Sequence, residues 1–171
     1  MRIANWSMAA ALGAIIWVSP AMAETVHQKV QGTKLFTGAG GNAVAKGQME
    51  TKKVEGAESG EVARVKGSMN QWGYVTAWFG IPTPAGECTI RFRLYNEAGE
   101  KNAKYMLYIA GQAGNSGFGE LKIPQDAKEN EFVTVDVSIS VSTDWNGLTI
   151  KKADKTDLPS PWIDTISVIL P

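Results

Sequence analysis

Short segments in which polar and apolar residues alternate constrain the fold of this chain more than any other feature. From Val133 to Val141, every second residue is valine or isoleucine. The run 88–95 alternates in the same way, and 163–170 is a third short run rich in isoleucine, leucine and valine. Successive side chains of a β-strand point to opposite faces, so this alternation predicts strands with one buried face.

Further strand patterns follow one another along the chain and are separated by turn residues. Strands are predicted at 62–66, 73–79, 105–110 and 148–150, with weaker edge strands within 24–60. Turns or loops are predicted at 82–86, 111–119 and 144–147. About eight short strands without crossover helices predict an all-β, antiparallel two-sheet β-sandwich of jelly-roll type, with an open barrel as the alternative.

The first 23 residues have the pattern of a secretory signal peptide. Arg2 precedes an apolar stretch at 8–18, and Ala21-Met-Ala23 has the form of a cleavage site. The apolar stretch is shorter than the roughly 20 residues that span a bilayer. We therefore expect residues 1–23 to be removed and residues 24–171 to form a single β-sandwich domain. The mature protein is expected to be periplasmic or secreted, monomeric and not inserted in a membrane.

Charge and reactive side chains exclude several functional classes. The chain has 17 Lys and Arg against 17 Asp and Glu, so no excess of positive charge favours nucleic acid as a partner. Cys88 is the single cysteine and alternates with apolar residues, which predicts a buried hydrophobic side chain. His27 is the single histidine, so neither a catalytic triad nor a histidine metal site is supported. We therefore expect a protein that is not an enzyme.

Three motifs follow one another between Gly60 and Leu170. Their residues are Gly73 to Val75, then Pro84 to Gly86 with Ile90 to Tyr95, then Ile163, Asp164, Ile166 and Val168. This order and spacing resembles the galactose-binding-like β-sandwiches, especially carbohydrate-binding modules of families 6 and 35. The resemblance covers about two thirds of the mature chain. It implies a jelly-roll fold and non-catalytic binding of a polysaccharide or oligosaccharide.

One feature of those modules is absent from this chain. They commonly begin with a Glu-x-Glu strand that supplies ligands to a structural calcium near the closing aspartate. No such pair follows residue 24; Glu50 is the nearest candidate, and one carboxylate does not provide the six or more oxygens that calcium takes. We therefore expect no cofactor, and the calcium that the resemblance allows lacks its expected ligand pair.

A stripe of aromatic residues is the first candidate binding surface. Trp72, Tyr74, Thr76 and Trp78 share one face of a predicted strand, opposite Val75, Ala77 and Phe79. An exposed aromatic face can stack against the apolar face of a sugar ring. From this stripe, Trp72 and Tyr74 are predicted ligand-binding residues. The alternative is that the aromatic side chains fill the core.

The run 88–95 offers a second candidate surface. Arg91, Arg93 and Tyr95 share its predicted outward face, where forked guanidinium groups could hold sugar hydroxyls or a uronate carboxylate. The alternative is that the arginines pair with acidic residues of neighbouring strands, such as Asp136.

Loop residues offer a third candidate site. Trp145 and Asn146 lie in an Asp-Trp-Asn-Gly sequence, where a turn gives a large apolar side chain little structural reason to be present. We therefore predict Trp145 and Asn146 as ligand-binding residues. For Trp162, packing over the end of the sandwich is the preferred interpretation.

These patterns predict an exported, non-catalytic carbohydrate-binding protein that uses aromatic stacking and polar contacts. Two alternatives from other classes stay open. One is an envelope structural or protein-interaction β-sandwich without a sugar site. The other is a small carbohydrate-active enzyme on a jelly-roll scaffold, which needs two carboxylates about 5 to 9.5 Å apart across a cleft.

Overall fold

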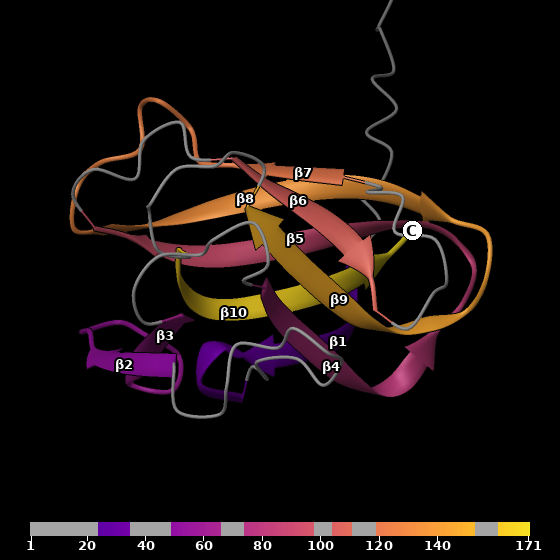
Figure 1. Ribbon diagram of the computed structural model, residues 1–171, viewed down its shortest axis with the longest axis horizontal. Helices are drawn as coiled ribbons and strands as arrows, with labels where there is room; N and C mark the ends of the chain where they lie inside the picture. Colours follow the sequence, from indigo (N-terminus) through magenta and orange to yellow (C-terminus); the bar gives the residue numbers. More distant parts are fainter. Residues whose placement is uncertain (1–23, 35–48, 66–73, 98–103, 111–118, 153–160) are drawn as a thin grey trace, which may run out of the picture.

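The computed structural model describes residues 24–34, 49–65, 74–97, 104–110, 119–152 and 161–171 (Figure 1). The proposed signal peptide lies outside these residues. The strands are β1 (Thr25–Gln31), β2 (Met49–Lys53), β3 (Glu61–Val65), β4 (Tyr74–Thr83), β5 (Gly86–Asn96), β6 (Lys104–Ile109), β7 (Gly119–Lys122), β8 (Glu131–Val141), β9 (Trp145–Lys152) and β10 (Trp162–Leu170). A 3-10 helix, η1 (Gly32–Lys34), follows β1. None of the described residues form a helix long and apolar enough to cross a bilayer.

The strands form two antiparallel sheets, which confirms the predicted two-sheet β-sandwich. A six-stranded sheet has the order β2-β3-β10-β5-β8, with β1 also paired to β10. A four-stranded sheet has the order β4-β9-β6-β7. In Figure 1, β6 and β9 of the four-stranded sheet cross over β5 and β10 of the six-stranded sheet. Side chains between the two sheets therefore form the core.

The register of β5 against β8 shows why the alternating sequences form this core. Ile90 lies opposite Val137 and Phe92 opposite Val135, so the apolar faces of both strands point between the sheets. Ile90 and Phe92 are fully buried. Cys88 lies on the same face and is 5% exposed, and this burial raises the pKa of its thiol. The prediction that Cys88 is a buried hydrophobic side chain is confirmed.

Two predicted boundaries are wrong. Residues 145–147, predicted as a turn, are the first residues of β9. The strand β4 also continues to Thr83, beyond the predicted turn start at residue 82. It pairs with β9 up to Trp78 and again at Thr83, and the register shifts between these two points. Residues 79–82 of β4 therefore leave the β9 ladder.

Candidate functional site

Arg91 lies on the outer face of the six-stranded sheet and is held by two carboxylates. Its Nε and Nη2 donate to Asp136 at 2.8 and 2.7 Å, and its Nη1 donates to Glu24 at 2.7 Å. Hydrogen bonds to Asp136 and then to Glu24 raise the pKa of Arg91, and Arg91 in turn lowers the pKa of Asp136. The alternative prediction, that Arg91 pairs with Asp136 of a neighbouring strand, is therefore confirmed.

Arg93 is also occupied within the fold. Its Nη1 donates to the carboxylate of Asp164, and its Nη2 donates to the Gly56 carbonyl at 3.0 Å. Its guanidinium lies 3.8 Å from the centre of the Phe132 ring. Asp164 is fully buried and also accepts the Glu58 N–H at 2.9 Å. Asp164 and Arg93 thus fix the β2–β3 loop against the sheet.

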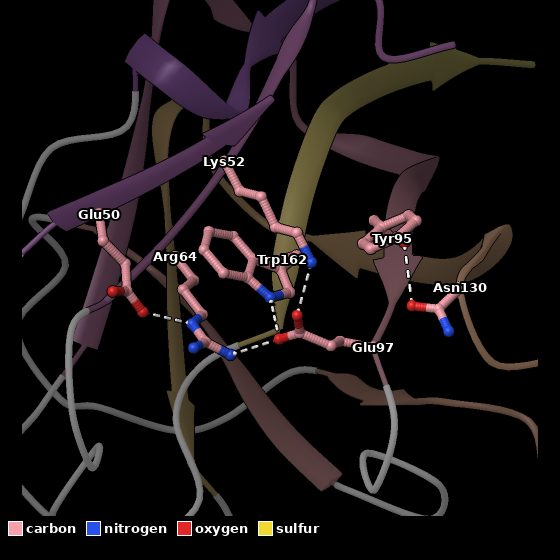
Figure 2. A network of polar contacts seen from close by, with 7 residues as sticks. All are labelled: Glu50, Lys52, Arg64, Tyr95, Glu97, Asn130 and Trp162. Atoms are coloured by element: carbon pink, nitrogen blue, oxygen red, sulfur yellow. Dashed lines mark hydrogen bonds and ion pairs between the residues drawn. The ribbon is translucent and has the colours of Figure 1, made fainter. Parts of the chain in front are cut away.

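Tyr95 is packed rather than presented to solvent. It is 9% exposed, and its hydroxyl donates to Asn130 Oδ1 at 3.1 Å (Figure 2). Its ring meets the Phe132 ring edge-on, with 5.4 Å between centroids. Tyr95 was predicted to point outward from β5. It instead belongs to a small apolar cluster with Val62 and Trp162.

Glu97 is the centre of a polar network beside this cluster. Its carboxylate accepts from Lys52 Nζ at 2.6 Å, Trp162 Nε1 at 2.7 Å and Arg64 Nη1 at 3.2 Å (Figure 2). Arg64 also donates to Glu50 at 2.6 Å and stacks on the Trp162 ring. Lys52 and then Trp162 lower the pKa of Glu97. Because these groups satisfy one another, we interpret the network as structural.

The predicted loop site at Trp145 and Asn146 is wrong for Trp145. Trp145 is the first residue of β9 and is 4% exposed, with its ring edge-on to Phe79 at 5.7 Å. Trp145 belongs to the core between the sheets, so its apolar area is removed from water. Asn146 is exposed.

Among the side chains of the aromatic stripe that the structure describes, Trp78 provides one exposed ring. Trp72 and the side chain of Tyr74 lie outside the described residues. Thr76 is buried and shares a hydrogen bond with Thr149 at 3.1 Å, whereas Trp78 is 40% exposed. The other two tryptophans that the structure describes, Trp145 and Trp162, are both buried.

Trp78 borders a hollow of about 630 Å³ between β4 and the β1–η1 segment. We call it the Trp78 hollow; its lining residues are Lys29, Val30, Gln31, Thr33, Lys34, Glu58, Trp78 and Gly80. Lys29 and Glu58 form an ion pair at 2.9 Å, and each is about 40% exposed. The hollow therefore combines an aromatic wall with amide, hydroxyl and charged groups that remain accessible.

Gly147 of β9 allows the Trp78 ring to lie against the four-stranded sheet. Gly147 pairs with Trp78 in the ladder. A Cβ atom at this position would lie 2.7 Å from Trp78 Cζ3 and 2.6 Å from the Cβ of Ala110. Such contacts are too short for any side chain, so glycine is required here if the ring is to keep its place.

Gly147→Ala is expected to displace the Trp78 ring and to lower the free energy of unfolding by about 1–3 kcal/mol, as overpacking does. Urea denaturation measures the stability, and the Trp78 indole resonance reports the displacement. Gly80→Ala is the control, because no atom lies within 4 Å of a Cβ at that position. Wild-type stability together with an unmoved indole resonance in Gly147→Ala would contradict this account.

A larger groove of about 770 Å³ lies where β1, β5, β8 and β10 approach residue 171. Hydroxyl groups of Thr89, Ser138 and Ser140 and the carboxylates of Glu24 and Glu87 line it. No aromatic side chain is found among its described lining residues. The part of the chain that the structure covers also has no cluster of three or more His, Cys, Asp or Glu residues that could hold a metal ion. The Trp78 hollow is therefore the preferred site.

Trp78 belongs to the aromatic stripe that the sequence indicated, but the residues predicted from that stripe to bind a ligand were Trp72 and Tyr74. Two glycines could have pointed to Trp78. Gly80 follows it on β4 and has open space around it, and Gly147 lies beneath its ring. The second signal depends on the β4–β9 register, which the sequence alone does not provide.

Solved structures with a similar fold include carbohydrate-binding modules of both families that the sequence resembles. A family 35 module from Clostridium thermocellum has a TM-score of 0.61 and 11% identity, over 83% of this chain and 98% of that chain. The module CBM6cm-2 of Cellvibrio mixtus lichenase 5A, solved with cellotriose, has a TM-score of 0.58 and 13% identity, over 86% and 99%. The resemblance to families 6 and 35 is therefore confirmed at the level of the fold.

An enzyme is also among the similar structures. The exo-β-1,3-galactanase of Phanerochaete chrysosporium matches 86% of this chain with a TM-score of 0.58 and 14% identity. This chain spans only 29% of that enzyme. No family model and no curated protein matches the sequence.

Proposed function

We propose that this chain is an exported, non-catalytic carbohydrate-binding protein that holds a glycan in the Trp78 hollow. The observation that carries the proposal is the 40% exposed ring of Trp78 beside a hollow with polar walls. An exposed aromatic ring beside accessible polar groups is a surface on which the apolar face of a sugar ring can stack. The carbohydrate-binding modules with this fold support the same class of ligand.

The chemistry of the hollow suits a sugar. Its volume of about 630 Å³ is within the range of small-molecule sites. The Trp78 ring would cover the apolar face of one sugar residue. Hydroxyl groups at the ring edge would bond to Gln31, Thr33 and the Lys29–Glu58 pair, which supply both donors and acceptors.

The carboxylate inventory favours binding over hydrolysis. A glycosidase of the common kind uses two carboxylates on either side of the scissile bond. Glu58 is the one carboxylate among the described residues that line the Trp78 hollow, and it is paired with Lys29. This arrangement supports a binding role, with any catalysis left to another protein.

Trp78→Ala is expected to weaken glycan binding at least tenfold, a loss of about 1.4 kcal/mol or more, because it removes the stacking surface. Affinity gel electrophoresis of residues 24–171 against a panel with β-1,3-galactan, laminarin and soluble β-glucans identifies the ligand. Titration calorimetry of the variants with that ligand then measures the loss.

The matched control is Ile81→Ala, which removes an apolar side chain that is 54% exposed on the same strand but is not part of the hollow. It is expected to bind as the wild type does. Equal affinity of Trp78→Ala and the wild type would refute the proposed site, and no retardation on any polysaccharide would refute the proposed function.

The exposed side chains of Val26 and Ile81 are the observation that favours the protein-interaction alternative. They are 49% and 54% exposed on β1 and β4, and neither lines the hollow. Isolated exposed apolar side chains are ordinary on a protein surface. Carbohydrate binding is therefore the better-supported function.

A further inference from the structure

Residues 79–82 of β4 lack partners in the β9 ladder, and Gly80 among them lines the Trp78 hollow. Trp78 pairs with Gly147, and the next pair joins Thr83 to Trp145. The chain therefore leaves the four-stranded sheet immediately after Trp78. Backbone N–H and C=O groups that leave a ladder need other partners.

Within β1, His27 Nε2 lies 3.4 Å from the Pro82 carbonyl oxygen. Gln28 provides both partners of the Ile81 backbone from the other sheet. Its Nε2 donates to the Ile81 carbonyl at 2.6 Å, and its Oε1 accepts the Ile81 N–H at 3.1 Å. The same Nε2 lies 3.2 Å from Thr83 Oγ1. A side-chain amide thus bonds to the Ile81 backbone as a neighbouring strand would. Figure 1 shows β1 and β4 next to each other at this side of the sandwich.

The direction of the Gln28 side chain follows from an irregularity in β1. The register against β10 shifts between Val26 and Gln28, so that Gln28 lies opposite Val168. Val168 is a core residue on the inner face of β10. Gln28 therefore points inward toward β4, while the next residue, Lys29, lines the hollow.

We infer that Gln28 is the positioning residue of the Trp78 hollow. Its amide fixes residues 79–82 relative to β1, and this sets the gap between the Trp78–Gly80 wall and the Lys29–Gln31 wall. The inference rests on the proposed function for its effect on glycan affinity. Its effect on Trp78 itself can be measured without a ligand.

The test compares Gln28→Met, which keeps the length of the side chain and removes its hydrogen bonds to Ile81 and Thr83, with Gln28→Glu, which keeps an acceptor and loses the donor. Hydrogen exchange of the Ile81 amide reports the bond, and the Trp78 indole resonance, assigned with Trp78→Phe, reports the ring. The control is Ile139→Val, a core change in β8 away from the hollow. It reports the general effect of lower stability.

Gln28→Met is expected to speed Ile81 exchange at least tenfold, to move the Trp78 indole resonance and to weaken glycan binding several-fold, with Gln28→Glu intermediate. Ile139→Val should lower the Tm and leave all three unchanged. An unmoved Trp78 resonance in both Gln28 variants would overturn the inference, even with faster Ile81 exchange. If Gln28→Met fails to fold, Gln28→Glu decides by the same criterion.

The two proposals fail in different ways. If the Gln28 variants change the Ile81 exchange rate and the Trp78 resonance while the wild type binds no polysaccharide, that result would support the positioning role and refute the proposed function. Loss of binding in Trp78→Ala, with wild-type affinity in both Gln28 variants, would do the reverse.

Discussion

Arg93→Ala is expected to lower the free energy of unfolding by about 3 kcal/mol at neutral pH, because it leaves a buried carboxylate without its cation. Asp164 is fully buried, and its described partners are Arg93 and the Glu58 N–H. The expected loss is at the low end of the range for broken buried pairs, since Arg93 is 33% exposed and the Glu58 bond remains. Urea denaturation of residues 24–171 measures it.

The control for this prediction removes both charges. In Arg93→Met with Asp164→Asn, no buried charge is left unpaired, and the asparagine carbonyl still accepts the Glu58 N–H. The double variant should therefore be more stable than Arg93→Ala. A loss below about 1 kcal/mol in Arg93→Ala would show that the pair behaves as an ordinary surface ion pair.

Trp145→Ala is expected to destabilise the protein by about 3–5 kcal/mol, the usual cost of truncating a buried large aromatic residue. Trp145 packs edge-on against Phe79 in the core that joins the two sheets. Its removal leaves a cavity that neighbouring strands can fill only in part. Thermal and urea denaturation should show the same loss.

Trp145→Phe provides the matched control. The Trp145 Nε1–H is buried and has no acceptor among the described residues. Phenylalanine leaves a smaller cavity than alanine does and also removes this unsatisfied donor. Because the second effect partly offsets the first, we expect the free energy of unfolding to fall by about 1 kcal/mol. A Trp145→Ala variant of wild-type stability that loses glycan binding would instead return Trp145 to the list of ligand-binding residues.

Arg93→Ala and Trp145→Ala distinguish residues that stabilise the fold from residues that bind a ligand. Both positions attract interest from the sequence, since each combines a polar or aromatic side chain with a predicted surface location. The contacts of Arg93 and Trp145 lie within the fold, so we expect substitution at either position to act through stability. If Trp78→Ala loses glycan affinity and keeps its stability, a change in the fold does not explain the loss. Trp78 is therefore the position that tests the binding site.

The fold could be predicted because hydrophobic alternation is a local property. The valine and isoleucine residues of 133–141 identify a half-buried strand before its partner is known, and β5 shows the same pattern. Motif order then pointed to the galactose-binding-like sandwich. The ends of β4 and β9 were harder to predict from the sequence. Residues 79–82 leave the β9 ladder and Ile81 bonds instead to Gln28, about 50 residues earlier in the chain.

The site could be predicted only in part, because exposure depends on long-range pairing. Arg91 and Arg93 lie on the predicted outer face, but Glu24, Asp136 and Asp164 occupy them from three other segments. Trp78 and Trp145 both have patterns that allow either burial or exposure. Gly147 leaves room for the Trp78 ring, whereas Trp145 packs against Phe79 in the core.

The most direct test of glycan binding at Trp78 is a ¹⁵N-NMR titration of residues 24–171 with an oligosaccharide of the polysaccharide that retards the protein. The account predicts saturable shifts of the Trp78 indole N–H and of the amides of Gln31 and Thr33, with the Trp145 and Trp162 indoles unmoved. Shifts centred on Arg91 and the outer face of the six-stranded sheet, with Trp78 unchanged, would contradict it.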